Sequence, residues 1–287
     1  MSALGPAEIA ARRRPGLVLI IAGVRILAGF CLAFPLSSLV AGSGVGQRSQ
    51  GDRALFEGGG YLLLELLRVQ GNALLAAARG LVPLLLLALA VTCACNVALL
   101  VALDSRERLT SLDWLGRAWA RLPAQLVLVA GAALAQFVLL LLGSAALGGI
   151  PESLAKPVLT TAAQAAAILV IALLLAAVGG FADVAKAALV RHEARLNEGL
   201  ARAWVCARHR PFRAFFGWLP YSALFLLTAL LAAKLSEALD VSRPGAWRIA
   251  AVFVAHQLVI VVSIACRAAW FSRCLRLAAT THQAASS

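Results

Sequence analysis

The chain has 287 residues, of which 62% are hydrophobic and only 14% are charged, and its formal net charge is +13. An average soluble domain is about 45–50% apolar and about 25% charged. This composition excludes an ordinary water-soluble fold, which could not bury so much apolar side chain, and predicts a protein whose main solvent is lipid.

Six apolar stretches are long enough to cross a membrane, since about 20 apolar residues span its hydrocarbon core. We expect helices, because a backbone in lipid must satisfy its own hydrogen bonds, and no stretch alternates like a barrel strand. The stretches are residues 16–42, 81–103, 125–149, 158–181, 212–233 and 246–269. The sequence predicts an all-α membrane protein with six transmembrane helices in one polytopic domain (16–277), between a basic lead (1–15) and a tail (278–287).

Lys and Arg are concentrated in alternate loops between the apolar stretches. With residues 1–15 in the cytoplasm, seventeen basic residues fall on the cytoplasmic side and eight on the opposite side. Loops rich in Lys and Arg stay in the cytoplasm. We therefore expect a multi-pass protein of the bacterial inner (plasma) membrane with both termini cytoplasmic. The charge lies in loops beside the spans, which favours anionic lipid headgroups over nucleic acid as the partner.

Two segments allow more than one interpretation. The Arg run at 12–14, followed by an apolar stretch, resembles a signal peptide. That stretch is longer than the usual apolar region of about 7–15 residues and contains Arg25, so we expect a retained first span.

Residues 61–78 are the second segment with more than one interpretation. They are expected to form a helix that lies along the outer face, extends span two through a kink at Pro83, or takes a re-entrant path.

One seven-residue pattern occurs twice. Residues 113–119 and 198–204 both read acid-x-Leu-x-Arg-Ala-Trp, displaced by 85 residues. At helical spacing the Leu and Trp fall on one face and the acid and Arg on another, which is typical of a helix lying in the membrane interface. Pro123 and Pro211 follow the two copies and are expected to end the two helices. The pattern predicts amphipathic interfacial helices preceding spans three and five.

The repeat also indicates which side chains hold these surface helices. Tryptophan is enriched at membrane–water interfaces, and a basic residue near an anionic surface contributes about 1 kcal/mol. The predicted interfacial anchors are Arg117, Trp119, Arg202 and Trp204. We expect them to contact anionic headgroups of membrane lipids at the inner face. A protein partner or a second copy of the chain, as in a homo-oligomer, is the other kind of partner considered.

Ionisable residues inside spans are candidate functional groups, because lipid makes a charge costly. The candidate intramembrane polar site consists of Arg25, Asp183, Lys186 and His256. Asp183 and Lys186 are three residues apart and can form an ion pair on one helix. The glycines at 179 and 180 allow another helix to approach closely. Arg25 either extends to the headgroups or pairs with Asp183.

His256 lies near the middle of span six. Together with Asn96, Gln136 and Gln164 it could line a polar seam. Hydrogen bonding between helices is the favoured interpretation of these polar residues, and such contacts contribute about 0.6–2 kcal/mol each.

The usual signatures of catalysis are missing from the sequence. It has no phosphate-binding loop, no dinucleotide fingerprint and no nucleophile elbow. Cys93 and Cys95 would point about 200° apart on a helix, so they do not form a ready metal pair. His192 and Glu193 lack the second His of a zinc-hydrolase motif. We therefore predict no catalytic, metal-binding or cofactor-binding residue and no cofactor.

The layout resembles a known group of proteins. Six spans with basic elbows ending in Arg-Ala-Trp, and the run Asp-Val-Ala-Lys-Ala-Ala-Leu-Val at 183–190 leading into the second copy, are similar to bacterial six-helix inner-membrane proteins of uncharacterised function. These include the membrane region fused to some glycerophosphodiester phosphodiesterases. The resemblance covers residues 15–277 and implies the membrane fold. Because it includes no phosphodiesterase barrel, it implies no such activity.

These observations favour a non-enzymatic role. The prediction is a polytopic integral inner-membrane protein that organises the membrane or serves as a scaffold. The alternative is a transporter or channel (permease) component with a polar mid-membrane site that uses Arg25, Asp183 and His256. A membrane-embedded lipid enzyme ranks third.

Overall fold

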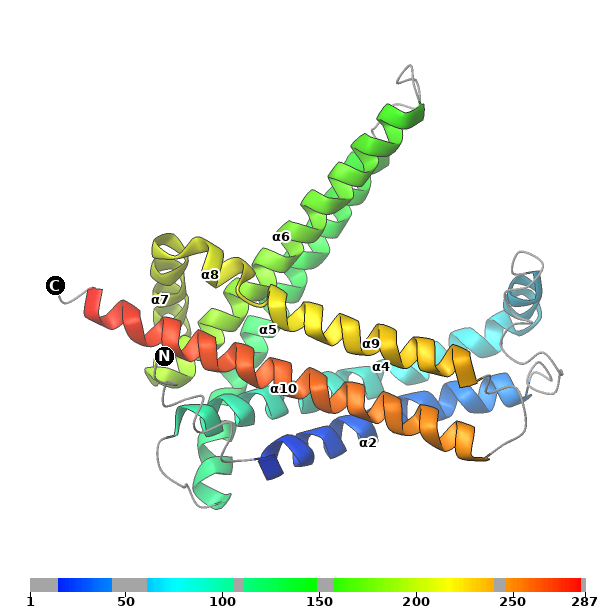
Figure 1. Cartoon of the computed structure of the whole chain (residues 1–287), viewed down its shortest axis with the longest axis horizontal. Coiled ribbons are helices and arrows are strands. Elements are labelled where there is room, and N and C mark those ends of the chain that lie inside the picture. The colour runs from blue at the N-terminus through cyan, green and yellow to red at the C-terminus, as the bar shows by residue number, and fades with distance from the viewer. Residues whose placement is uncertain (1–14, 43–60, 106–110, 149–156, 240–245, 285–287) are drawn as a thin grey trace. The chain divides into compact units, whose positions relative to one another are not determined.

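The computed structural model describes residues 15–42, 61–105, 111–148, 157–239 and 246–284. Every regular element in these ranges is a helix. Figure 1 shows the helices in chain order. They are α2 (Pro15–Gly42), α4 (Tyr61–Asp104), α5 (Ser111–Gly148), α6 (Pro157–Arg191), α7 (Leu196–His209), α8 (Pro211–Phe216), α9 (Leu219–Leu239) and α10 (Ala246–Ala284).

Six helical segments are long and apolar enough to cross a membrane, so the chain is an all-α, six-span membrane protein, as the sequence predicts. Along these spans most large apolar side chains are exposed, including Phe30, Leu86 and Leu169. Lipid is as apolar as these side chains, so their exposure carries no penalty there. The spans are Gly16–Phe34, Arg79–Asp104, Asp113–Gly148, Thr161–Arg191, Pro211–Leu239 and Trp247–Ala279.

The helix boundaries differ from the expected ones at Pro123 and Gly217, and they decide between the paths considered for residues 61–78. The expectation that a helix ends at Pro123 is wrong, because α5 continues through it. Proline is tolerated inside membrane helices where the freed carbonyl finds water or another donor. Likewise α4 runs from Tyr61 through Pro83 as one helix, so residues 61–78 extend span two. The fifth span is interrupted between α8 and α9 at Gly217.

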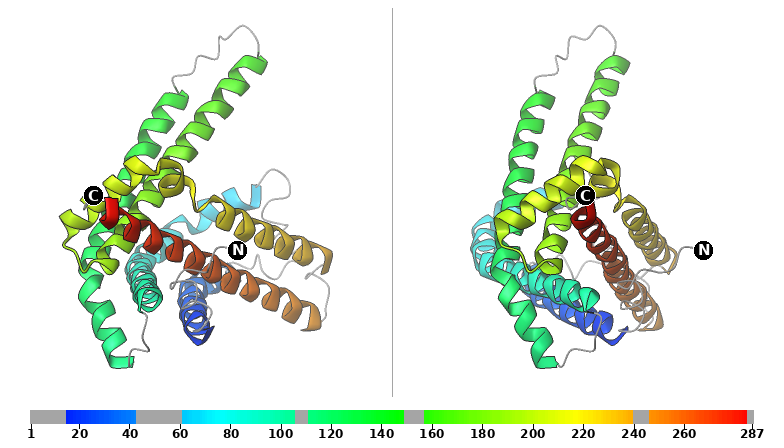
Figure 2. Two further views of the ribbon diagram at one scale, coloured as in Figure 1. Left: turned by 60° about the vertical axis from the view of Figure 1, so that its left-hand side comes forward. Right: turned by 90° about the vertical axis from the view of Figure 1, so that its left-hand side faces the viewer.

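The chain forms two compact units. Unit 1 contains Cys93–Ala223 and Cys266–Ser287, together with Met1–Pro15, and unit 2 contains Gly16–Thr92 and Leu224–Ala265. Within unit 1, α5 and α6 form a long antiparallel hairpin, which both views of Figure 2 show. Short helices α7 and α8 pack against α6. Most side chains of unit 2 are exposed or half-buried, and its buried side chains among the described residues are Ile21, Ala22, Ala232 and Ile264.

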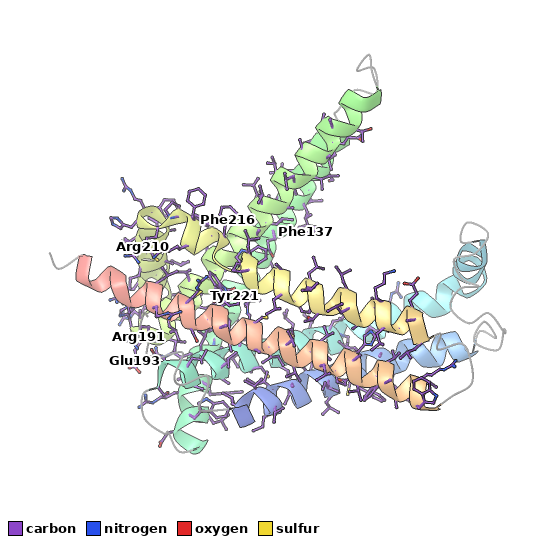
Figure 3. All side chains as sticks on the ribbon, viewed as in Figure 1. Phe137, Arg191, Glu193, Arg210, Phe216 and Tyr221 are labelled. Carbon is purple, nitrogen blue, oxygen red and sulfur yellow. The ribbon has the colours of Figure 1, made fainter. Side chains whose placement is uncertain are left out.

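The dense core of unit 1 lies where three helix ends meet. Residues 97–103 of α4 and 182–190 of α6 are buried without a break. The last part of α10 adds Trp270, Phe271 and Cys274, each at most 2% exposed. In Figure 3 the labelled Arg191 and Glu193 lie together where α6 ends. This core holds the buried polar residues described next.

Candidate functional site

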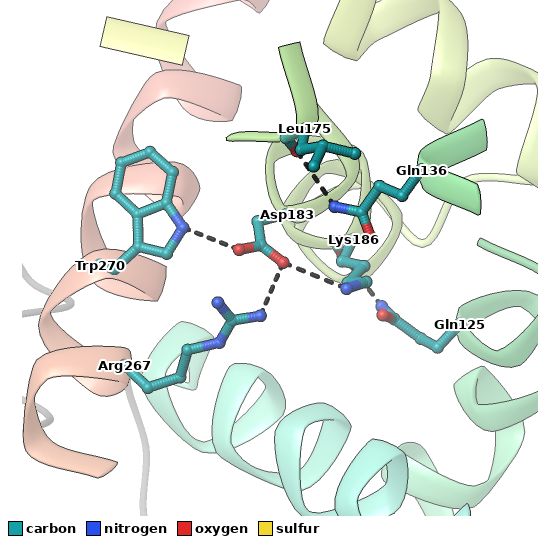
Figure 4. Close-up of polar contacts among 7 residues, drawn as sticks. All are labelled: Gln125, Gln136, Leu175, Asp183, Lys186, Arg267 and Trp270. Carbon is teal, nitrogen blue, oxygen red and sulfur yellow. Dashed lines mark hydrogen bonds and ion pairs between the residues drawn. The ribbon is translucent and has the colours of Figure 1, made fainter. Parts of the chain in front are cut away.

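The buried polar site of unit 1 is centred on Asp183, which lies in α6 and is only 5% exposed. Its Oδ1 accepts hydrogen bonds from Lys186 Nζ at 3.1 Å and from Arg267 Nη2 at 2.8 Å. Its Oδ2 accepts a hydrogen bond from the indole nitrogen of Trp270 at 2.9 Å. Figure 4 shows the three donors converging on this one carboxylate. We call Asp183, Lys186, Arg267 and Trp270 the Asp183 cluster.

Helical spacing explains how two short sequence segments supply the cluster. Asp183 and Lys186 are three residues apart on α6, and Arg267 and Trp270 are three apart on α10, so each pair shares a helix face. The guanidinium of Arg267 also lies 4.5 Å from the centroid of the Phe271 ring, which adds a cation–π contact. The amide of Gln125 in α5 donates to the Lys186 carbonyl at 3.1 Å. Three helices are thus joined at this point.

The electrostatics of the cluster favour a structural role. A buried charge is costly unless it is paired and hydrogen-bonded. Asp183 meets both conditions, because each carboxylate oxygen has at least one donor. Among the described residues no three His, Cys, Asp or Glu side chains are grouped so that they could hold a metal ion.

A second set of contacts fastens the end of α6 to its neighbours. Arg191 forms an ion pair with Asp104 at the end of α4. Arg121 of α5 lies 3.4 Å from Glu193, just beyond α6. The ring of His192 lies 3.1 Å from the Ala278 carbonyl of α10. The core of unit 1 is therefore closed by polar contacts on three sides.

Gly180 and Gly199 permit close packing between helices of unit 1, and Gln136 adds a hydrogen bond between two of them. A Cβ on Gly180 would lie 2.6 Å from the Phe215 carbonyl oxygen, so only glycine lets α8 approach α6 this closely. This confirms the close approach expected at residues 179–180. Gly199 of α7 likewise faces Leu189 of α6. Gln136 donates to the Leu175 carbonyl at 3.0 Å, which confirms the interhelical hydrogen bond as its role.

Helix α7 packs one of its sides against the rest of unit 1. Gly199, Ala203, Cys206 and Ala207 are buried on one side, and burial raises the pKa of the Cys206 thiol. Trp204 is 61% exposed, and its ring lies 6.5 Å from that of Phe181 in an edge-on arrangement.

The structure brings together two of the four predicted intramembrane residues. Asp183 and Lys186 form the expected pair, whereas Arg25 and His256 belong to unit 2. His256 is exposed, and its Nδ1 lies 2.8 Å from the Val252 carbonyl of its own helix. The donors that complete the cluster are Arg267 and Trp270, which sequence reasoning did not join to Asp183.

The predicted interfacial anchors fall on exposed or half-buried positions. Arg117 is exposed and Trp119 is 72% exposed on α5, while Arg202 is half-buried on α7.

In comparisons with known proteins, no family model, curated protein or solved structure matches the chain.

Proposed function

We propose that this integral membrane protein is a non-enzymatic membrane organiser or scaffold of the bacterial inner membrane, with both termini in the cytoplasm. One observation carries the proposal. The buried charges of the Asp183 cluster are engaged with one another, while cationic and Trp side chains on α5 and α7 are exposed. The groups free to act on a partner are therefore those that suit a lipid surface.

The exposed groups match the chemistry of anionic headgroups. Arg117 and Trp119 lie within two residues of each other on α5, and Arg208 follows Trp204 by one turn on α7. Basic residues near an anionic surface contribute about 1 kcal/mol each, and Trp favours the headgroup level. Two such surfaces, one on α5 and one on α7, would hold several anionic lipids beside the chain.

A permease is the second candidate, favoured by one specific observation. The cluster places two cationic side chains against a single carboxylate, so its formal charge is not balanced by its own residues. A transporter could use such a site to attract an anion. The full set of donors on Asp183 argues for a fixed structural element instead.

The test of the scaffold role uses the two repeated tryptophans. Trp119→Ala combined with Trp204→Ala removes both exposed indoles and should lower folded yield and weaken surface anchoring, because the headgroup-level contacts are lost. The protein would be extracted with its surrounding lipid in polymer nanodiscs. The ratio of phosphatidylglycerol to phosphatidylethanolamine in that shell should exceed the bulk ratio and fall in the double variant.

Trp247→Ala is the matched control, since Trp247 is 62% exposed at the start of α10 and lies outside the repeat. An unchanged lipid ratio in the double variant, or an equal fall in the control, would contradict the scaffold role. Anion flux into proteoliposomes that is lost in Asp183→Asn would support the permease. Labelling of Arg117→Cys and Arg202→Cys from opposite sides of the membrane would overturn the predicted topology.

A further inference from the structure

An apolar groove of about 650 Å³ runs along unit 1 between α5 and α6 and is bordered at one end by α7 and α8. Small residues create its hollow, with Gly131 and Ala135 on α5 and Ala177 on α6. A Cβ on Gly131 would meet no atom within 4 Å, so this helix face is open. Nearly all of the lining is apolar side chain, which suits hydrocarbon and no polar ligand.

The length of the groove matches one leaflet of a bilayer. Its lining on α5 extends from Val127 to Leu139, which is about 18 Å at 1.5 Å per residue. Half of a hydrocarbon core is about 15 Å thick. The antiparallel pairing of α5 with α6 places Leu139 near Leu174 at one end, and Val127 near α7 at the other. The groove thus extends from the surface helix toward the middle of the bilayer.

The shape of the groove suits one extended hydrocarbon chain. It is about 18 Å long and has a volume of about 650 Å³, and an acyl chain can fill it directly from the surrounding bilayer. The exposed arginines at its α7 end favour a phospholipid over a second helix as the occupant.

Three aromatic rings surround the end of the groove near α7, which we call the aromatic mouth. Phe181 lies with its ring centroid 6.5 Å from both Trp204 and Phe215, edge-on to the first and stacked with the second. All three rings line the groove. Among them Trp204 is of the type enriched at the headgroup level of a membrane. The mouth therefore lies where the glycerol and phosphate of a lipid would be.

Charge at the mouth indicates the kind of headgroup. Leu196, Leu200 and Trp204 line the groove at intervals of one helical turn, and Arg208 is the next residue in that series. Arg208, Arg210 and Arg213 are all exposed where α7 passes into α8. An anionic phosphate is the complementary group.

We infer that the groove binds one acyl chain of an anionic phospholipid, with its headgroup at Arg208. This inference rests on the proposed function and adds to it the lipid that α7, which carries the second copy of the repeat, would contact. The acyl chain fills the space between α5 and α6, and the aromatic mouth holds the first carbons below the headgroup. In the predicted orientation this lipid comes from the cytoplasmic leaflet.

The test uses a phosphatidylglycerol with a photoactivatable diazirine near the end of one acyl chain, in proteoliposomes of the full chain. Ala132→Leu with Ala135→Leu fills the groove, because both residues line it. Ala130→Leu with Ala133→Leu is the matched control on the same helix, with both residues exposed outside the groove. Crosslinks should map to Leu139 and Leu174 and should fall about tenfold in the filled variant, equivalent to about 1.4 kcal/mol. The control should keep the wild-type yield.

Equal labelling of the filled variant and the wild type would overturn the inference, as would crosslinks spread evenly over all lipid-facing helices. A disulfide formed between two chains through Ala135→Cys would show that a second copy covers the groove and would also overturn it. If the filled variant does not fold, Gly131→Leu gives the same readout. Arg208→Gln should remove the preference for phosphatidylglycerol over a phosphatidylcholine probe. The lipid ratio in nanodiscs tests the proposed function separately, so enrichment that persists in the filled variant contradicts only the groove.

Discussion

The two copies of the repeated pattern agree in their side-chain faces and differ in how their helices end. Ala118 and Ala203, which precede the Trp in each copy, are both buried, and Trp119 and Trp204 are both exposed. The first copy continues through Pro123 as part of α5. The second ends at His209, and a new helix, α8, begins at Pro211. A proline follows both copies, so proline alone does not decide whether the helix ends.

Packing partners explain the difference. After the second copy, Gly180 lets the backbone of α8 lie against α6, which stabilises the change of direction at Arg210 (φ −139°, ψ 62°). The residue 85 positions before Gly180 is Cys95, whose side chain would prevent so close an approach. Likewise Gly199 of the second copy lies against Leu189, while its counterpart Trp114 donates from its indole to the Ala98 carbonyl at 3.0 Å. The repeated pattern determines which side of the helix is buried. The glycines near the second copy determine how closely the neighbouring helices pack and therefore where the chain turns.

The largest expected loss of stability concerns Asp183 on α6, the helix that precedes the second copy. Asp183→Ala leaves the buried Lys186 and the half-buried Arg267 without their carboxylate, and removing one partner of a buried pair costs about 3–5 kcal/mol. The position equivalent to Asp183 before the first copy is Ala98, so only the second module depends on this acid. Thermal unfolding in mild detergent should show the loss. Glu198→Gln, an exposed acid in the second copy, should change the free energy of unfolding by less than about 0.5 kcal/mol.

A medium effect is expected at the close approach of α6 and α8. Gly180→Ala places a methyl group 2.6 Å from a backbone oxygen that cannot move aside easily, and overpacking of this kind costs about 1–3 kcal/mol. Gly116→Ala in the first copy meets no atom within 4 Å and should stabilise its helix by about 0.5–1 kcal/mol. Opposite signs in the melting temperatures would support the packing explanation. Destabilisation by both substitutions would contradict it.

The smallest effect concerns the hydrogen bond that ties the first copy to α4. Trp114→Phe keeps the aromatic ring and removes the donor to the Ala98 carbonyl, which should cost about 1 kcal/mol. Trp119→Phe is the control, because Trp119 projects from the same copy and is 72% exposed. Equal melting temperatures for the two variants would mean that the Trp114 bond does not stabilise the first copy.

The sequence predicts features that lie within one helix better than contacts between residues far apart in the chain. The six spans follow from apolar length, and the pair of Asp183 and Lys186 follows from its spacing on one helix. The contacts of Asp183 with Arg267 and Trp270 join residues 84 and 87 positions apart, which no local period encodes. Their spacing of three on α10 was the available signal. The apolar groove depends on α7 and α8 packing beside α6, an arrangement of separate helices that no local period encodes.

The length of α6 has a consequence for the membrane itself. Its 35 residues extend about 52 Å, well beyond a hydrocarbon core of about 30 Å. The tightly packed residues 182–190 lie at one end of this helix, and most side chains at residues 161–174 are exposed. A span longer than the hydrocarbon core is accommodated by tilting, so we expect the α5–α6 hairpin to tilt more in a thin bilayer than in a thick one.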